Sequence, residues 1–292
     1  MTGLIIANHS NLYEVKEIEH YMCQVRGKIK RQGLSPLVGD RVEFSVTDKE
    51  KKEGVIEGVL PRINCSKRPK MSNLEQLVLV VSSKLPKPDL LTLDKQLIYA
   101  QYLKIPAVIV VNKIDLDEEA SLRKIKEIYE KIGYPVLGTV AKEKKGILEL
   151  IERLRGKINA FSGNSGVGKS TLMNAIFETE LTKEGKISKK NKRGKNTTTS
   201  VSLYELEKNT YVADTPGFST FAIDEIESKD LASYFVEFLP HITECEYDDC
   251  HHIKEEKCGV KKALQEGKIS QERYEHYTKI YIEKKEKEEH RW

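Results

Sequence analysis

The stretch Gly163-Asn164-Ser165-Gly166-Val167-Gly168-Lys169-Ser170 matches the pattern G-x-x-x-x-G-K-[ST] of a phosphate-binding P-loop. The apolar residues Ile158, Ala160 and Phe161 precede it and a helix-compatible run at 171–177 follows it, so its context favours a P-loop over a chance glycine-rich turn. Glycines let backbone N–H groups surround phosphate oxygens, and the following helix directs its positive end at them. We expect these residues and Thr171 to bind a nucleotide, with Lys169 at the β- and γ-phosphates and the Ser170 hydroxyl on Mg²⁺.

A second motif, Asn112-Lys113-Ile114-Asp115, follows the apolar run 107–111, which is typical of a buried strand. Ligands of α/β proteins bind at the carboxyl ends of such strands. The Asp115 carboxylate is able to accept from both N1–H and the exocyclic amine of guanine, a pair that adenine lacks. We expect Asn112 to hold the loop and contact the base, and the Lys113 stem to lie against the ring. Alone the tetrapeptide also fits an ordinary turn, but beside a P-loop it indicates guanine recognition.

The segment Thr139-Val140-Ala141-Lys142 follows a third short apolar stretch. It is similar to the S-A-K loop of GTPases, whose backbone contacts the guanine oxygen, with Val140 where serine is usual. We expect Ala141 and Lys142 to complete the base pocket. An ordinary strand-to-helix loop is the alternative interpretation.

Two further stretches contain groups suited to Mg²⁺ and the γ-phosphate. In Thr197-Thr198-Thr199, we expect Thr198 to ligate Mg²⁺ and sense the γ-phosphate, although the same residues also fit the start of a strand. The apolar residues from Tyr211 lead to Asp214-Thr215-Pro216-Gly217, a D-x-x-G pattern. We expect Asp214 to hold Mg²⁺ through water and the Gly217 N–H to meet the γ-phosphate. The predicted catalytic residues are therefore Lys169, Thr198, Asp214 and Gly217.

The order of these motifs differs from that of an ordinary GTPase, in which the P-loop comes first. Here the guanine-reading loops at 112–115 and 139–142 precede the P-loop. Circular permutation is tolerable when the ends of a domain lie close together. The segment after Gly217 then leads directly into the carboxyl-terminal region. We hypothesise that a change at the γ-phosphate moves that region, which equal hydrogen exchange of residues 226–292 with GDP and with a GTP analogue would contradict.

Residues 1–66 read as short strands separated by Gly, Asn and Pro. Five such strands fit a small closed barrel of the OB-fold type. The basic segment 26–31 offers phosphate contacts, so the barrel is a candidate oligonucleotide binder; a packing module is equally compatible. From residue 67 the pattern changes to alternating strands and helices, which indicates an α/β domain with a largely parallel sheet.

The carboxyl-terminal residues Cys245, Cys250, His252 and Cys258 form the pattern C-x4-C-x-H-x5-C. Three thiolates and an imidazole suit a closed tetrahedral Zn²⁺ site, which predicts a structural metal. The neighbouring His251 fits the spacing as an alternative ligand, and buried free cysteines are the alternative to a metal. Residues 270–290 have the pattern of a charged helix packed by its tyrosines.

Composition limits the class of protein. Of the 292 residues, 39% are apolar and 32% charged, which is typical of a globular protein, and the net charge is +4. No apolar run has the length of a membrane span and the first residues lack a signal-peptide pattern, so a cytoplasmic protein is expected. Residues 183–195 hold seven basic side chains and one acid, which favours a polyanionic partner; an ordinary lysine-rich surface is the alternative.

Taken together, these motifs resemble the circularly permuted ribosome-assembly GTPases, the RsgA or YjeQ family. The resemblance implies a multidomain chain, with an OB-fold β-barrel at 1–66, a central α/β permuted P-loop GTPase at 67–225 and a mainly helical zinc-binding domain at 226–292. It further implies a monomer that binds GTP or GDP with Mg²⁺ and docks on the small ribosomal subunit and its rRNA in late maturation. Besides the motifs above, the resemblance rests on Ser35–Val42, Gly54–Glu57, Leu60–Arg62 and Asp214–Phe218.

Two positions bear on the hydrolytic water. Phe218 follows Gly217 where Ras-like enzymes have a water-orienting glutamine, and the family shares an apolar residue there. Members of the family usually have a histidine before the threonine triplet, where this chain has Asn196. Asparagine is no general base at neutral pH, although it is able to hydrogen-bond a water. The resemblance therefore implies slow intrinsic turnover, with positioning and charge stabilisation as the main catalytic effects.

Two other functions compete with a GTPase checkpoint on ribosomal RNA. An rRNA-binding assembly module that only senses GTP or GDP would show no acceleration of hydrolysis by the small subunit. A P-loop ATPase or small-molecule kinase would bind ATP and GTP equally, which residues 112–115 argue against.

Overall fold

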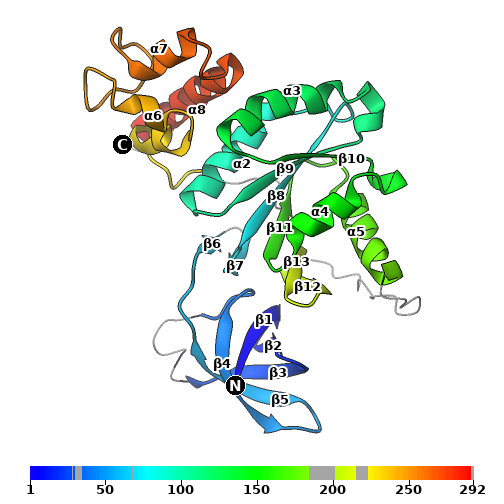
Figure 1. Ribbon diagram of the computed structural model, residues 1–292. Coiled ribbons are helices and arrows are strands. Elements are labelled where there is room, and N and C mark those ends of the chain that lie inside the picture. Colours follow the sequence, from blue (N-terminus) through cyan, green and yellow to red (C-terminus); the bar gives the residue numbers. More distant parts are fainter. Residues whose placement is uncertain (28, 30–34, 68, 184–200, 215–222, 291–292) are drawn as a thin grey trace.

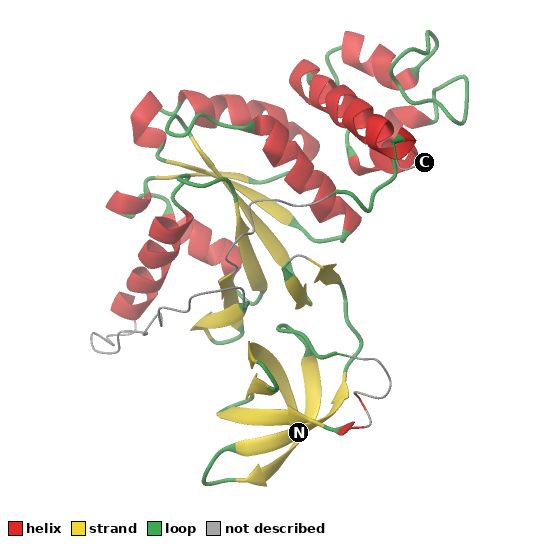
Figure 2. Ribbon diagram, turned by 180° about the vertical axis from the view of Figure 1, so that it is seen from behind, coloured by secondary structure: helices red, strands yellow, loops and turns green. Residues whose placement is uncertain are grey.

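The computed structural model describes residues 1–27, 29, 35–67, 69–183, 201–214 and 223–290. A β-barrel formed by the amino-terminal residues lies at one end of the molecule, a sheet covered by helices lies in the middle, and a group of helices lies at the other end (Figures 1 and 2). Among the helices in these ranges, none combines the length and the apolar character that crossing a bilayer requires.

The barrel is built from five strands: β1 (Thr2–His9), β2 (Leu12–Lys16), β3 (His20–Val25), β4 (Arg41–Asp48) and β5 (Glu53–Val59). Antiparallel pairs join β1 to β2, β2 to β3, β4 to β5 and β1 to β4, and a parallel pair joins β3 to β5. These pairings close the ring, so the predicted OB-fold barrel is confirmed. Its interior is filled by alternate side chains of the strands, among them Ile5, Val15, Phe44 and Ile56.

The connector after the barrel contains a small hairpin of β6 (Cys65–Lys67) and β7 (Lys70–Ser72), which the basic composition of this segment did not predict. The fully buried Asp40 carboxylate attaches it to the barrel, since it accepts from Ser72 Oγ at 2.6 Å and from Arg62 Nε at 2.7 Å and Nη2 at 2.8 Å. Gly39 has φ +93°, and a Cβ there would meet Ser72 O at 2.1 Å. The barrel and the connector are therefore locked together by contacts distant in sequence.

The central sheet has the order β10-β9-β8-β11-β13-β12. All neighbours are parallel except β12 and β13, which form an antiparallel hairpin. The strands are β8 (Gln76–Ser82), β9 (Ala107–Asn112), β10 (Val136–Thr139), β11 (Ile158–Ser162), β12 (Ser202–Glu207) and β13 (Thr210–Asp214). The predicted α/β layout is confirmed, and the strand leading into residues 163–170 lies between β8 and β13.

Helices cover both faces of this sheet (Figure 1). They are α2 (Leu90–Tyr102), α3 (Ala120–Tyr129), α4 (Ile147–Leu154) and α5 (Lys169–Lys183), with short 3₁₀ turns η1 (Ile114–Asp117), η2 (Glu130–Ile132) and η3 (Ala141–Glu143). Alternate residues of β8 face opposite sides, because side chains alternate along a strand. Leu77 and Leu79 belong to the core under α2 and α3, whereas Val78 and Val80 belong to the core under α4 and α5.

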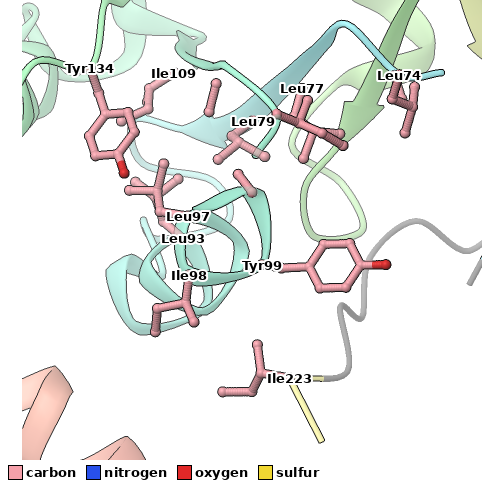
Figure 3. Close-up of a cluster of buried hydrophobic side chains, with 14 of the residues drawn as sticks. Leu74, Leu77, Leu79, Leu93, Leu97, Ile98, Tyr99, Ile109, Tyr134 and Ile223 are labelled. Carbon is pink, nitrogen blue, oxygen red and sulfur yellow. The ribbon is translucent and has the colours of Figure 1, made fainter. Parts of the chain in front are cut away.

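Figure 3 shows the core on the α2 side, where Leu93 and Leu97 pack toward Leu79 and Ile109 of the sheet. Ile223, the first described residue after position 214, lies near Ile98 in the same cluster. Burying a side chain of this size stabilises the fold by about 1.5–3 kcal/mol. The buried apolar side chains of α2 therefore fix this helix on the sheet.

The barrel also joins the central sheet. Ala7 of β1 pairs with Ser202 of β12, which continues the sheet from one part to the other. An ion pair between Lys16 Nζ and Glu205 at 3.4 Å crosses the same junction.

The carboxyl-terminal part consists of η4 (Ser228–Tyr234), α6 (Leu239–Ile242), α7 (Gly259–Gln265) and α8 (Gln271–Glu289). Tyr277, Ile280 and Tyr281 form the buried face of α8, as the tyrosine spacing predicted. Phe235 and Phe238 stack at 5.1 Å and pack against Tyr277.

Candidate functional site

A cavity of about 600 Å³ opens at the carboxyl edge of the central sheet. Asp115 and Lys169 both line it, so the predicted guanine-reading loop and the predicted phosphate loop face one space. Predicted residues in its wall are Asn112, Lys113, Asp115, Ala141, Lys142, Ser165, Gly166, Gly168, Lys169, Ser170 and Thr171. The wall also contains Val140 of the 139–142 motif and three residues outside the motifs: Leu85, Leu116 and Glu143.

Glycine is required at two positions of the P-loop. Gly163 has φ +148°, and a Cβ there would lie 2.1 Å from Val80 O of the neighbouring strand. Gly168 has φ +99°, and a Cβ there would lie 2.4 Å from Asn112 Nδ2. The loop thus packs directly against β8 and against the guanine-reading loop, which leaves no space for a side chain.

Lys169 is the first residue of α5, and its ammonium group lies within the P-loop. Its Nζ donates to Gly163 O at 2.6 Å and to Asn164 O at 3.0 Å. Burial lowers the pKa of Lys169 from its ordinary value. The backbone carbonyls therefore hold the ammonium at the amino end of the helix, where anions bind.

Asn112 holds three loops together. Its side chain is 1% exposed, its Nδ2 donates to Val167 O at 3.0 Å, and its Oδ1 accepts from Thr139 Oγ1 at 3.1 Å and Ala141 N at 3.2 Å. The structure thus shows the loop-holding contacts predicted for Asn112. Ala141 lies in the loop whose backbone we expect at the guanine oxygen, and here its N–H donates to Asn112 Oδ1.

Lys113 crosses from the guanine-reading loop to the P-loop. It has φ +64°, its carbonyl accepts from Ser83 Oγ, and its Nζ donates to Leu85 O and, at 2.7 Å, to Gly166 O. The stem therefore forms part of the cavity wall. Asp115, in η1, is exposed and also lines the cavity.

Three predicted P-loop residues do not line the main cavity. Gly163, Asn164 and Val167 face a smaller hollow on the α2 side of the loop. The Val167 side chain is 3% exposed within the apolar core, and Asn164 Nδ2 donates to Asp89 Oδ2 at 3.2 Å. Asp89 caps α2, and its place before an apolar helical stripe is the sequence signal for such a cap.

Of the remaining predicted nucleotide ligands, two lie outside the described parts of the chain. Thr198 and Gly217 fall within 184–200 and 215–222, as does the proposed route from Gly217 to the carboxyl-terminal region. Asp214 ends β13, two strands from β8, so its backbone is placed at the same edge of the sheet as residues 163–170.

A second candidate site lies in the carboxyl-terminal part, where the ligand atoms of Cys245, Cys250, His252 and Cys258 all lie within 4.8 Å of one another. His252 Nδ1 is 3.5 Å from Cys245 Sγ and 3.4 Å from Cys258 Sγ, and the two sulfurs are 3.9 Å apart. In a tetrahedral Zn²⁺ site, neighbouring ligand atoms lie about 3.5–3.8 Å apart. The donor set and its spacing therefore fit one Zn²⁺.

The groups around this Cys₃His cluster position its loop. Glu255 accepts from His251 N and Ile253 N, each at 2.8 Å, and the Tyr274 hydroxyl donates to His252 O at 2.7 Å. Burial lowers the pKa of His252, which favours the neutral imidazole that binds metals. His251, the alternative ligand by spacing, instead packs its ring 5.2 Å from that of Tyr281.

Comparison with protein families gives two matches along the chain. The model of the RsgA N-terminal domain matches residues 2–56, and the model of the RsgA GTPase matches residues 59–224. The small ribosomal subunit biogenesis GTPase RsgA of Thermotoga maritima is 41% identical over 286 residues, which cover 96% of each chain. The protein of the same name from Clostridium acetobutylicum is 42% identical over 279 residues, which cover 95% of this chain and 96% of that protein.

Solved structures give the same result. The crystal structure of YjeQ from Thermotoga maritima matches with a TM-score of 0.85 and 39% identity, and covers 97% of each chain. YloQ, described as a circularly permuted GTPase, matches with a TM-score of 0.82 and 32% identity, and covers 98% of this chain and 95% of that one. This chain therefore belongs to the RsgA GTPase family and is a GTP hydrolase with a circularly permuted nucleotide-binding domain.

Proposed function

We propose that this GTPase binds the small ribosomal subunit and assists its late maturation, hydrolysing GTP to GDP and phosphate with turnover that the subunit stimulates. The observation that supports this most directly is the likeness over nearly the whole chain to proteins named for small ribosomal subunit biogenesis. The shared cavity of the two predicted nucleotide loops adds a physical basis for a GTP-dependent step.

In the proposed complex, guanine lies at the end of the cavity lined by Asp115 and Ala141, and the phosphates lie at Lys169. The Asp115 carboxylate accepts from the two N–H donors of guanine, which sets the preference for GTP over ATP. The N–H groups of 165–170 and the Lys169 ammonium hold the β- and γ-phosphates.

When bound with the nucleotide, Mg²⁺ would supply positive charge that offsets the negative charge developing on the phosphates during hydrolysis. Ser170 lines the cavity beside Lys169 and is the proposed protein ligand there. Thr198 and Asp214 are the further proposed ligands, and Gly217 is the proposed γ-phosphate contact. We assign no residue to the positioning of water, since Asn196 occupies the place of the family's usual histidine.

We further propose that the Cys₃His cluster holds one structural Zn²⁺. All four ligand positions are supplied by the protein, and Cys258 also caps α7 by accepting from Lys261 N at 3.4 Å. A bound metal supplies folding energy by cross-linking the loop 245–258 to α7. We also propose that the domains end at residues 66 and 225, and that the protein is a cytoplasmic monomer.

The test is single-turnover hydrolysis of GTP with and without purified small subunits. Under the proposal, the small subunit accelerates hydrolysis, and purified large subunits, as a matched control, do not. An rRNA-binding module that only senses the nucleotide would bind the small subunit with unchanged hydrolysis, and that outcome would replace the proposal with the alternative.

A further inference from the structure

Helix α2 is hydrogen-bonded to the residues on both sides of Gly163, the first residue of the P-loop. At its amino end, the Asp89 carboxylate caps the helix by accepting from Thr92 N at 3.0 Å, and it also accepts from Asn164 Nδ2 at 3.2 Å. Two turns further along, the buried Gln96 Nε2 donates to the buried Ser162 Oγ at 3.1 Å. Because Ser162 and Asn164 flank Gly163, α2 and the P-loop hold a fixed relation to each other.

The opposite side of α2 is bonded to α8. Asp94 is 0% exposed, and Arg273 Nη1 donates to its Oδ1 at 2.5 Å. The Tyr129 hydroxyl donates to the same oxygen at 2.8 Å, and His276 Nδ1 lies 2.6 Å from the other oxygen. A carboxylate buried this completely needs all of these partners, because leaving it unpaired costs several kcal/mol.

Arg273 carries this contact into the carboxyl-terminal part. Its guanidinium, 2% exposed, also donates to both oxygens of Glu237 at 2.5 and 2.9 Å, and its centre lies 4.8 Å from the Phe235 ring. On the next residues of α8, the Tyr274 and Tyr277 hydroxyls donate to His252 O and His251 O at 2.7 and 2.8 Å. A chain of short polar contacts therefore runs from the P-loop through α2 and α8 to the Cys₃His loop.

We propose that α2 couples nucleotide binding at the P-loop to the docking of α8, with Asp89 and Gln96 as positioning residues for the P-loop and Asp94 as the anchor of α8. The proposal rests on the use of the P-loop as the phosphate site. The P-loop and α8 are able to influence each other because α2 is a rigid helix that makes specific hydrogen bonds to both. Such coupling is reciprocal for binding free energies. This route needs only occupation of the P-loop, so GDP suffices, whereas a route through residues after Gly217 requires the γ-phosphate.

The first experiment measures hydrogen exchange of the full chain without nucleotide, with Mg²⁺-GDP and with a Mg²⁺-GTP analogue. Under the proposal, GDP alone slows exchange in α8, residues 271–289. Asp89→Ser keeps a helix-capping oxygen but is too short to reach Asn164. We expect it to weaken GDP binding on the order of threefold and to remove the GDP-dependent change in α8. Gln96→Met, which keeps the length of the side chain without its donor, is expected to do the same.

The second experiment is a double-mutant cycle on GDP affinity. His276→Ala removes the more exposed of the two basic partners of Asp94 and leaves Arg273 in place. Under coupling, Asp89→Ser weakens GDP binding less in the His276→Ala background than in the unmodified chain. Lys124→Ala is the matched control, because it breaks the exposed ion pair of α3 with Glu272 of α8, 2.8 Å long, without touching α2.

The outcomes separate this inference from the function on which it rests. If the unmodified chain binds no GDP, the proposed nucleotide site itself is wrong. If it binds GDP while exchange in α8 stays unchanged, or while the effects of Asp89→Ser and His276→Ala simply multiply as with Lys124→Ala, the coupling through α2 is overturned.

Discussion

At the scale of single residues, the candidate nucleotide site depends on side chains that hold neighbouring loops together through hydrogen bonds. Asn112 holds three loops through its amide, and Lys113 bridges two of them with its ammonium. The cavity wall then contains two groups of opposite charge, the Asp115 carboxylate and the Lys169 ammonium. Each of these two groups can be tested by a single substitution.

Asp115→Asn tests guanine recognition. The amide loses the charge-assisted hydrogen bonds to guanine but is able to donate to the oxygen that xanthine has in place of the exocyclic amine. We expect GTP affinity to fall about a hundredfold and affinity for xanthosine triphosphate to rise. Asp117→Asn, a neighbouring carboxylate outside the cavity wall, is the control. Unchanged discrimination between the two nucleotides in Asp115→Asn would remove Asp115 from the site.

Lys169→Arg tests the charge at the phosphate end. Burial lowers the pKa of Lys169, and a bound phosphate raises this pKa again. At a pH where Lys169 is deprotonated in the free protein, nucleotide binding is therefore accompanied by uptake of a proton on Lys169. GDP affinity should therefore be highest below the lowered pKa and fall as pH rises through it, by at most about tenfold per pH unit. Arginine stays charged over this pH range. In Lys169→Arg, the only remaining dependence of GDP affinity on pH is therefore the one caused by deprotonation of guanine. Equal slopes between pH 7 and 10 would contradict the assignment.

At the scale of elements, the hairpin β6–β7 shows what the sequence did not reveal. Pro69 and the basic residues around it indicate a loop, and local propensity favours no strand there. The hairpin forms because Ser72 bonds to Asp40 and Asn73 Nδ2 donates to Gly39 O at 2.8 Å, both over more than thirty positions of sequence. Contacts of this kind have no signature in a single sequence.

Asp40→Asn tests this attachment. The amide leaves the Arg62 charge without its carboxylate partner and places an N–H donor next to the donors of Arg62 and Ser72. We therefore expect the free energy of unfolding to fall by about 3 kcal/mol. The measurements are the unfolding temperature and hydrogen exchange of residues 65–72. Asp48→Asn in the same barrel, where the carboxylate pairs with exposed Lys51 at 3.8 Å, should cost less than about 1 kcal/mol. Equal effects of the two substitutions would show that Asp40 is no special anchor.

Other elements were predictable because their signals are local. The apolar runs of β8 and β9, the stripe of α2 and the loop at 163–170 are each defined by neighbouring residues. The buried charge at Asp94 was not predictable, because its partners Arg273 and His276 lie about 180 positions away. On sequence alone, Arg273 reads as one more charge on a highly charged helix.

At the scale of the whole molecule, the Cys₃His cluster and the docking of α8 depend on each other. Tyr274 and Tyr277 of α8 bond to the carbonyls of His252 and His251 in the predicted metal loop. Loss of a metal from this loop would therefore loosen the face of α8 that packs on it.

Cys258→Ser isolates the metal ligand, because serine retains the cap of α7 and lacks the thiolate. We expect the unmodified chain to carry one Zn²⁺, and the variant to bind it at least about a hundredfold more weakly and to exchange faster in residues 271–289. Cys65→Ser, an exposed cysteine distant from the cluster, is the control. Metal content measured by mass spectrometry decides the outcome; equal zinc in both variants would contradict the assignment.

The permuted order of the motifs has a consequence for synthesis of the chain. Strands β8, β9 and β10 pair with one another in the order in which they are translated. Only afterwards does β11 add to the free edge of β8, and β13 then adds to β11. In a nascent polypeptide, the guanine-reading loops at 112–115 and 139–142 are thus able to form before the P-loop has been translated. Free nucleotide has no complete binding site on such a partial product, so it stabilises only chains in which translation has passed residue 214.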